Sequence, residues 1–208
     1  EFLNLEGNKL STSKNWAVWL PEYLEDFPNQ QDVLRYALTT NAPETKDNDF
    51  TWKDFQAKNN GDLADIFGNF INRTLTFVSK YFDSQIPEPG PLEGDDQALV
   101  AAIKNAPAAV GDLLETFQVK KGLQECMNLA RLGNKYLTDA EPWKIFKTDP
   151  ERVKTILNIS LEICANLVIV CEPFLPFTAE KLRRMMKLPV RKWAEAGNPE
   201  LLETGHQL

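Results

Sequence analysis

Residues 149–171 read DPERVKTILNISLEICANLVIVC, and this stretch decides the fold. Asp149 is a favourable helix cap and Pro150 is favoured in a first turn, so we predict that a helix begins here. Apolar residues then recur every three or four positions, as Val153, Ile156, Leu157, Ile163, Leu167 and Val170. So apolar a helix belongs in the interior of a bundle.

Further helices are expected around this one. The first begins at Thr51, whose hydroxyl is expected to cap the amide of Asp54, and continues to about Phe82. Its apolar stripe comprises Leu63, Ile66, Phe67, Phe70, Thr74, Phe77, Val78 and Tyr81. Two more helices are predicted at about 95–116 and 118–139, and Thr178 is expected to cap a last, basic helix that ends near Lys187.

The predicted fold is therefore mainly α, an antiparallel bundle of about five helices. The bundle is expected over residues 49–188, where no segment alternates as a strand. Residues 1–48 are expected to hold a short strand at 2–5, a polar loop and a connector with a short helix near 31–40, and residues 189–208 form a tail. Both ends look cut, so we expect a fragment of a longer protein.

Composition narrows the class of protein. With 208 residues and 43% hydrophobic residues, the chain can bury a sizeable core, and we expect neither a signal peptide nor an apolar run of transmembrane length. A cytoplasmic protein without a membrane partner is predicted. The three cysteines, Cys126, Cys164 and Cys171, lie in apolar helical patterns, which favours buried, reduced thiols over a metal site.

The charge pattern leaves two interpretations open. A net charge of −7 argues against a protein that coats nucleic acid indiscriminately, because such proteins use a dominant positive field. Positive charge is nevertheless clustered, at Lys135, Lys144 and Lys147 and at Lys181, Arg183, Arg184, Lys187, Arg191 and Lys192. Such clusters fit local recognition of nucleic acid and a solvated helix face equally well.

Few residues offer catalysis. The single histidine, His206, lies among turn residues near the end of the chain, and no glycine-rich phosphate loop of a known type occurs. We therefore predict that the bundle is a binding module without a cofactor or metal of its own. The loop Lys9-Leu10-Ser11-Thr12-Ser13-Lys14 differs, because its cations and hydroxyls could close on phosphates. The alternative is an ordinary polar surface loop.

Two groups in the bundle could contact RNA. Asn69 and Arg73 lie one helical turn apart, opposite the apolar stripe, and together offer the donors, acceptors and planar cation that suit base edges and phosphate. Trp143 follows Pro142 at an expected helix start, where an exposed indole would stack on an unpaired base. A solvated helix face and a tryptophan packed in the core are the respective alternatives.

A family resemblance joins these features. Gly7-Asn8-Lys9-Leu10-Ser11-Thr12-Ser13 is similar to the lysine-methionine-serine-lysine-serine signature of class I aminoacyl-tRNA synthetases. The resemblance implies that Lys9, Ser11, Thr12, Ser13 and Lys14 contact the phosphates of ATP in the parent enzyme. Lys9, Ser11 and Ser13 match the signature, whereas Leu10 replaces methionine and Thr12 replaces the second lysine. Our hypothesis is that Lys14 takes over the role of that lysine.

The bundle resembles the anticodon-binding domain of the methionyl-tRNA synthetase family. Gly68-Asn69 with Asn72-Arg73, Asn134-Lys135-Tyr136-Leu137 and Ala140-Glu141-Pro142-Trp143 carry this resemblance. It implies that Trp143 stacks on cytosine, the first anticodon base, while Asn69, Arg73 and Pro142 contact this base and its neighbours. Residues of about 15–48 would then form the element that contacts the tRNA stem.

The resemblance also implies the activity and partners of the parent. It would attach methionine to its tRNA, using ATP with magnesium as substrate, and its catalytic domain, with a possible zinc-bearing insertion, would precede Glu1. The chain alone should bind tRNA and catalyse nothing. Two alternatives remain: a class I synthetase of another specificity, such as leucine, isoleucine, valine or cysteine, and a non-enzymatic helical adaptor that binds protein.

Overall fold

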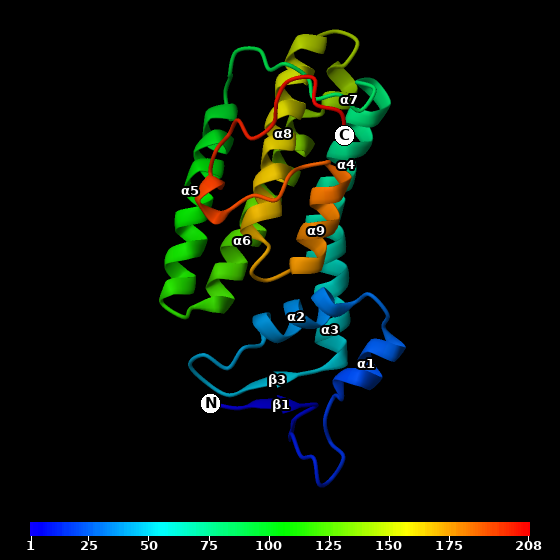
Figure 1. The fold of residues 1–208 in the computed structure, drawn as a ribbon, viewed down its shortest axis with the longest axis vertical. Coiled ribbons are helices and arrows are strands. Elements are labelled where there is room, and N and C mark those ends of the chain that lie inside the picture. The colour runs from blue at the N-terminus through cyan, green and yellow to red at the C-terminus, as the bar shows by residue number, and fades with distance from the viewer.

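Helix α8 (Pro150–Val170) forms the centre of the structure, a computed structural model that describes residues 1–208. Asp149 caps it as predicted, because its carboxylate accepts a hydrogen bond of 3.0 Å from the backbone N–H of Arg152. Around α8 lie α4 (Asn69–Tyr81), α5 (Asp96–Glu115), α6 (Val119–Ala140) and α9 (Pro176–Met185) (Figure 1). The mainly α, five-helix bundle predicted from the sequence is confirmed.

Helix α8 also corrects one expectation from composition. By length and hydropathy it could cross a membrane, although no such run was expected from the sequence. In the structure, 94% of its most apolar 18-residue window is buried inside the bundle, as in the core helix of a globular domain. Cys164 of this helix, together with Cys126 and Cys171, is a buried free thiol, as predicted.

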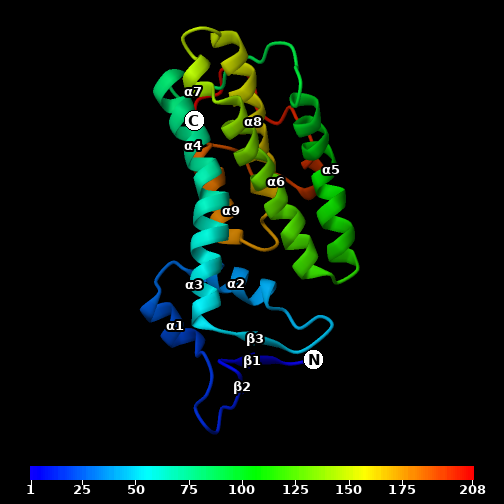
Figure 2. The same ribbon diagram turned by 180° about the vertical axis from the view of Figure 1, so that it is seen from behind.

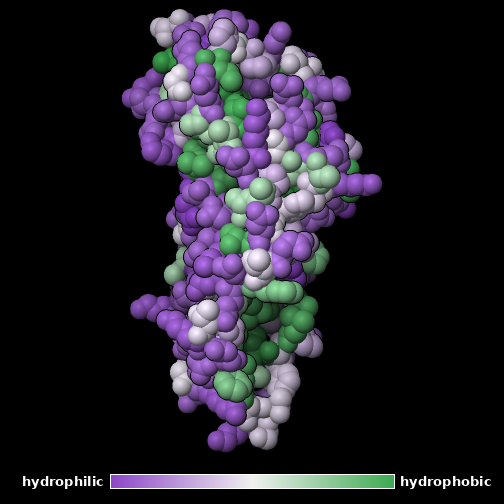
Figure 3. Space-filling model, turned by 90° about the vertical axis from the view of Figure 1, so that its left-hand side faces the viewer, coloured by the Kyte–Doolittle hydropathy of each residue, from purple (hydrophilic) through white to green (hydrophobic).

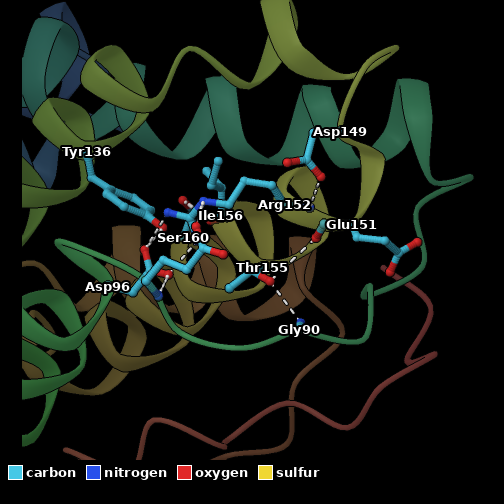
Figure 4. A network of polar contacts seen from close by, with 10 residues as sticks. Gly90, Asp96, Tyr136, Asp149, Glu151, Arg152, Thr155, Ile156 and Ser160 are labelled. Carbon is cyan, nitrogen blue, oxygen red and sulfur yellow. Dashed lines mark hydrogen bonds and ion pairs between the residues drawn. The ribbon is translucent and has the colours of Figure 1, made fainter.

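One buried ion pair ties α5, α6 and α8 together (Figure 4). The carboxylate of Asp96 accepts hydrogen bonds from the guanidinium of Arg152, at 2.5 and 2.8 Å, and from the hydroxyl of Tyr136, at 2.5 Å. Burial opposes ionisation of Asp96, but these bonds and the N–H of Glu93 outweigh it and hold the pKa of the carboxyl below its usual range. The network therefore positions α6 against its neighbours.

The predicted helix at 51–82 is continuous but changes type along its length. It comprises α3 (Trp52–Lys58), a π-helical segment η1 (Asn59–Gly68) and α4. Thr51 caps it as predicted, accepting from the N–H of Asp54 at 3.1 Å. The wide π turns were not predicted, and they bring Gly68 so close to the Leu63 carbonyl that an added Cβ would lie 3.1 Å from its oxygen.

The N-terminal part of the chain, including α3, has a small core of its own. Strands β1 (Leu3–Leu5), β2 (Asn8–Lys9) and β3 (Asn48–Phe50) form a sheet in the order β2-β1-β3, with β1 antiparallel to β2 and parallel to β3. Helix α1 (Leu20–Asp26) follows, and α2 (Gln31–Thr40) confirms the short helix predicted there. Only the first strand was predicted, because β3 forms by pairing with β1, which is more than forty residues away in sequence.

Helix α2 joins the connector to the bundle. Arg35 donates to the backbone carbonyls of Phe174, at 2.9 Å, and Pro173, at 3.0 Å, in the turn that follows α8. The prediction that Thr178 caps the last helix is wrong, because α9 already begins at Pro176. Thr178 instead lies inside its first turn and donates its N–H to Asp32 at 2.6 Å.

The tail packs back onto the bundle. It contains a short 3-10 turn, η2 (Trp193–Glu195), and is held by two polar side chains of α8. Asn166 accepts from the N–H of Gly197 at 2.8 Å, and Glu162 accepts from the N–H groups of Leu201 and Leu202 at 2.9 Å each. The tail therefore covers part of the apolar surface of the bundle.

Candidate nucleic-acid interface

A sharp reversal of the chain presents Trp143 at one end of the bundle. Helix α6 ends at Ala140; the next residue, Glu141, has a left-handed backbone with φ 42° and ψ 53°, and α7 (Pro142–Ile145) follows it. Pro142 is buried and starts this helix with its fixed φ. The indole of Trp143 is 44% exposed, so it is not a core side chain.

Arg73 lies against this indole. Its guanidinium carbon is 5.2 Å from the centroid of the Trp143 ring, a cation–π contact between α4 and α7. Asn69, one turn earlier on α4, is exposed on the same side of the helix. The structure therefore brings together the four residues that the sequence singled out, namely Asn69, Arg73, Pro142 and Trp143.

Two residues of α6 complete the cluster. The NH1 group of Arg73 donates to the side-chain oxygens of Asn134, at 3.3 Å, and Thr138, at 3.2 Å. The amide of Asn69 donates to the same Asn134 oxygen at 3.5 Å. In the sequence, Asn134 stands out only as part of a matching pattern and Thr138 does not stand out, although their i, i+4 spacing just before Pro142-Trp143 indicates a shared face.

Arg73 keeps donors available for a ligand. Both of its hydrogen bonds come from NH1, and neither Nε nor NH2 donates to a protein atom. These two N–H groups form the flat edge with which arginine binds two acceptors at once, as on phosphate or a base edge. The cluster thus combines a half-exposed ring with a held guanidinium whose free edge can still bind.

Each basic cluster seen in the sequence is paired in part. Lys135 forms an ion pair with Asp139, and Lys144, the residue after Trp143, forms one with Glu141 at 2.8 Å. Three of the six cations near the end are also paired: Glu180 binds both Arg183 and Arg184, and Glu195 binds Arg191. Exposed pairs of this kind are weak, so Lys144 can exchange its partner for phosphate.

The loop at residues 9–14, called the signature loop below, lies at the other end of the molecule from α7, which carries Trp143 (Figure 2). It follows β2 and closes between Ser11 and Trp16, whose backbone groups exchange hydrogen bonds of 2.9 and 2.8 Å. The hydroxyls of Ser11 and Ser13 are 3.2 Å apart, and the N–H of Lys14 donates to Ser11 at 3.4 Å. The exposed loop thus gathers hydroxyls at a tight turn.

An apolar hollow lies beside this loop. Its volume is about 710 Å³, and its lining includes Leu3, Leu10, Leu20, Leu34, Leu38 and Phe50. Figure 3 shows hydrophobic surface gathered in this lower part of the molecule. The large exposed side chains here include Phe2, which is 65% exposed. Apolar surface of this kind is typical of a protein interface.

The described residues contain no cluster of three or more His, Cys, Asp or Glu side chains that could hold a metal ion. His206 lies in the tail, where a ring nitrogen is 2.9 Å from the carbonyl of Met186. The geometry thus defines a helical bundle that carries an exposed tryptophan–arginine cluster at one end and is joined to a loop rich in hydroxyls.

Comparison with known families identifies the module. Residues 1–75 match the model described as tRNA synthetases class I (M), and residues 86–208 match the model described as the anticodon binding domain of methionyl tRNA ligase. The second match covers more than half of the 208 residues. The chain belongs to the methionyl-tRNA ligase anticodon-binding family.

Individual relatives agree with this assignment. The methionine–tRNA ligases of Flavobacterium psychrophilum and Bacteroides fragilis are each 59% identical to the whole chain, which spans 31% of their length. The structure of Mycobacterium tuberculosis methionyl-tRNA synthetase in complex with methionyl-adenylate is similar over the whole chain, with a TM-score of 0.89 and 25% identity, and the chain covers 41% of it. The chain thus spans about a third of its curated relatives.

Proposed function

We propose that this chain recognises the anticodon of methionine tRNA as part of a methionine–tRNA ligase. The observation that carries the proposal is the half-exposed Trp143 with Arg73 held against its ring at 5.2 Å. An exposed indole stacks on an unpaired base, and this is worth about 1–3 kcal/mol per base. The first anticodon base, cytosine, is the base that we assign to Trp143.

The neighbouring residues supply selectivity. Asn69 and the free edge of Arg73 provide donors toward the edge of the stacked base and its neighbours, while Pro142 holds the start of α7 in place. Hydrogen-bonded recognition discriminates strongly, because a wrong base leaves these groups unpaired. Positive charge near the site adds an electrostatic contribution to the affinity for RNA, which weakens as the salt concentration rises.

The proposed parent enzyme links methionine to the terminal ribose of its tRNA through a methionyl-adenylate, with ATP and magnesium as substrate. Lys9, Ser11, Thr12, Ser13 and Lys14 then stabilise charge that develops on the ATP phosphates. The rest of the catalytic site belongs to a preceding domain, which is also where a zinc-bearing insertion would lie. This function belongs in the cytoplasm, away from membranes.

The apolar hollow beside the signature loop supports the proposal that another domain of the same chain packs there. Its lining of leucines and Phe50 lies directly beside the signature loop, since Ser11 and Thr12 also line it. A catalytic domain of the same chain would cover this surface and receive the loop at its ATP site. The connector would thereby relate the site of chemistry to the bundle that reads the anticodon.

The decisive experiment is equilibrium binding of the 208-residue chain to methionine tRNA and to the same tRNA with its first anticodon base changed, at two salt concentrations. We expect the base change to weaken binding, and Trp143→Ala to cost at least about 1 kcal/mol with the unchanged tRNA. Phe117→Ala is the matched control, since Phe117 is 84% exposed on the turn between α5 and α6, away from α7.

Equal binding to both tRNAs, or equal effects of Trp143→Ala and Phe117→Ala, would refute anticodon recognition by this site. Salt-insensitive capture of a protein partner with no affinity for tRNA would point instead to a helical adaptor. The electrostatic contribution to tRNA affinity should fall with added salt, whereas the contribution from stacking on Trp143 should persist.

A further inference from the structure

Asn134 occupies the centre of the contacts between α4 and α6. Its side-chain oxygen accepts from Arg73, at 3.3 Å, and from Asn69, at 3.5 Å. Its amide nitrogen donates to the backbone carbonyl of Ile66, in η1, at 2.7 Å. One planar group thus connects three residues at the junction between the π-helical segment and α4.

We propose that Asn134 is a positioning residue for anticodon recognition, which holds the Arg73 guanidinium against Trp143 before RNA arrives. This inference rests on the proposed function and deepens it. Asn134 is half-buried behind Arg73, so its role is to act through that side chain. The residue that would touch the base is Arg73, and Asn134 sets where it points.

Arginine has a long, mobile side chain. A long side chain that is free in the unbound protein must be ordered on binding, and this ordering weakens affinity. Arg73 has only two side-chain partners, Asn134 and Thr138, in addition to the ring of Trp143. Because both bonds use NH1, they fix the guanidinium while leaving Nε and NH2 free for RNA.

The helix that carries Arg73 is also held by Asn134. Asn69 is the first residue of α4 and Arg73 is the fifth, directly after the ten-residue π-helical segment. The residue at which π turns change to α turns therefore sets the direction in which both side chains point. The Asn134 bond to Ile66 lies three residues before Asn69. It therefore holds this junction against α6, in register with the site.

Asparagine suits this position because it offers a donor and an acceptor on one rigid plane. Aspartate would keep the acceptor for Arg73 but would face the Ile66 carbonyl without a donor. Alanine would lose both contacts. Asn158 of α8 provides a matched control, since it is also half-buried and its amide donates to the backbone carbonyl of Pro87 at 3.0 Å, with no contact to Arg73.

The test is a double-mutant cycle on tRNA affinity in the 208-residue chain, measured with methionine tRNA. We expect Asn134→Ala to weaken binding about five- to tenfold, the loss of one net hydrogen bond and of preordering. In an Arg73→Met background the same change should weaken binding less than twofold. Asn158→Ala should leave affinity unchanged, and urea unfolding of each variant confirms that a folded chain is compared.

Different failures have different meanings. An equal loss from Asn134→Ala with and without Arg73 would show that Asn134 does not act through Arg73, and would overturn the inference while leaving the proposed function intact. No loss from Asn134→Ala alone would also overturn it. If neither Arg73→Met nor Trp143→Ala affects affinity, the proposed function itself fails, and the inference fails with it.

Discussion

Asp32 of α2 accepts a hydrogen bond of 2.6 Å from the backbone N–H of Thr178, in the first turn of α9. An acid in the connector thus caps a helix of the bundle, although the two residues are 146 positions apart in sequence. An acidic side chain at this end of α9 interacts favourably with the helix dipole, and it also provides an acceptor for an N–H group that has no partner within the helix. It helps to set the bundle, and with it Trp143, relative to the signature loop.

Replacement of Asp32 tests this link. We expect Asp32→Ala to lower the free energy of unfolding by about 1 kcal/mol, toward the lower range for a lost helix cap. The loss is limited because the substitution also removes the other carboxylate oxygen of Asp32, which is buried without a hydrogen-bond partner. Urea unfolding measures the effect. Asp26→Ala, at an exposed acid that ends α1, is the control, and equal unfolding midpoints for both variants would contradict the capping role.

Gly133 lies where α4 and α6 approach closely. A Cβ at this position would lie 2.4–2.9 Å from ring atoms of Phe70, which is fully buried and cannot move aside. We expect Gly133→Ala to destabilise the chain by about 2 kcal/mol through overpacking. Thermal and urea unfolding check this value.

Gly111 is the matched control on α5. A Cβ there would meet the Trp193 ring at 3.6 Å, an ordinary contact, so Gly111→Ala should stabilise the chain by about 0.5–1 kcal/mol through helix propensity. If the two substitutions have the same sign and size, the close approach at Phe70 does not limit the spacing of α4 and α6.

Glu162 predicts a pH dependence of stability. Burial raises the pKa of Glu162 from 4.5 to about 7, despite the hydrogen bonds from Leu201 and Leu202. Because the folded state holds the proton more tightly than the unfolded chain, the associated stability is present below about pH 4.5 and is lost as pH rises through about 7. The full change is on the order of 3 kcal/mol.

The measurement is the free energy of unfolding between pH 4.5 and 8 for the unchanged chain and for Glu162→Gln. The variant should lose the decline with pH that Glu162 causes, even if its absolute stability falls with the altered hydrogen bonds to the tail. Glu172→Gln, at an exposed acid just after α8, should retain that decline. Parallel curves for the unchanged chain and Glu162→Gln would disprove the assignment.

Replacement of Lys14 tests the role of the signature loop in the proposed parent enzyme. It is exposed, and its N–H donates to Ser11 in the turn that also holds Thr12, where the family places a second lysine. If Lys14 replaces that cation, Lys14→Ala should slow ATP–pyrophosphate exchange at least about tenfold, because charge stabilisation near the phosphates is lost. Lys46→Ala, at an exposed connector lysine, should have no effect. An unchanged rate of ATP–pyrophosphate exchange after Lys14→Ala would exclude the hypothesis that Lys14 takes the role of the second signature lysine.

Local signals predicted much of the fold. The caps at Thr51 and Asp149, and the helix near 31–40, follow from interactions within a few residues, and all three are present. The apolar stripe predicted along residues 63–81 faces the core at Phe67, Phe70, Thr74 and Val78, which are buried. The site residues came from residue type, spacing and family resemblance, and their roles in RNA binding stay predictions.

Other features depend on contacts between distant segments. Thr178 looked like a cap because a hydroxyl follows two prolines, but a carboxylate on α2 performs this function instead. The strand β3 exists because β1 pairs with it, and the π turns of η1 carry no periodicity that differs clearly from an α-helix over so short a stretch. For Thr178 and for β3 the deciding partner is remote in sequence.

The sequence by itself determined the helices, their apolar faces and the candidate residues, because capping and periodicity act over one or two turns. Only the tertiary structure decided that Trp143 is half exposed and that Arg73 lies over it, held by Asn134. That arrangement requires α4, α6 and α7 to meet, and their packing depends on the whole core, including the tail that folds back onto α8. A side chain's exposure is set by what covers it, which no local pattern records.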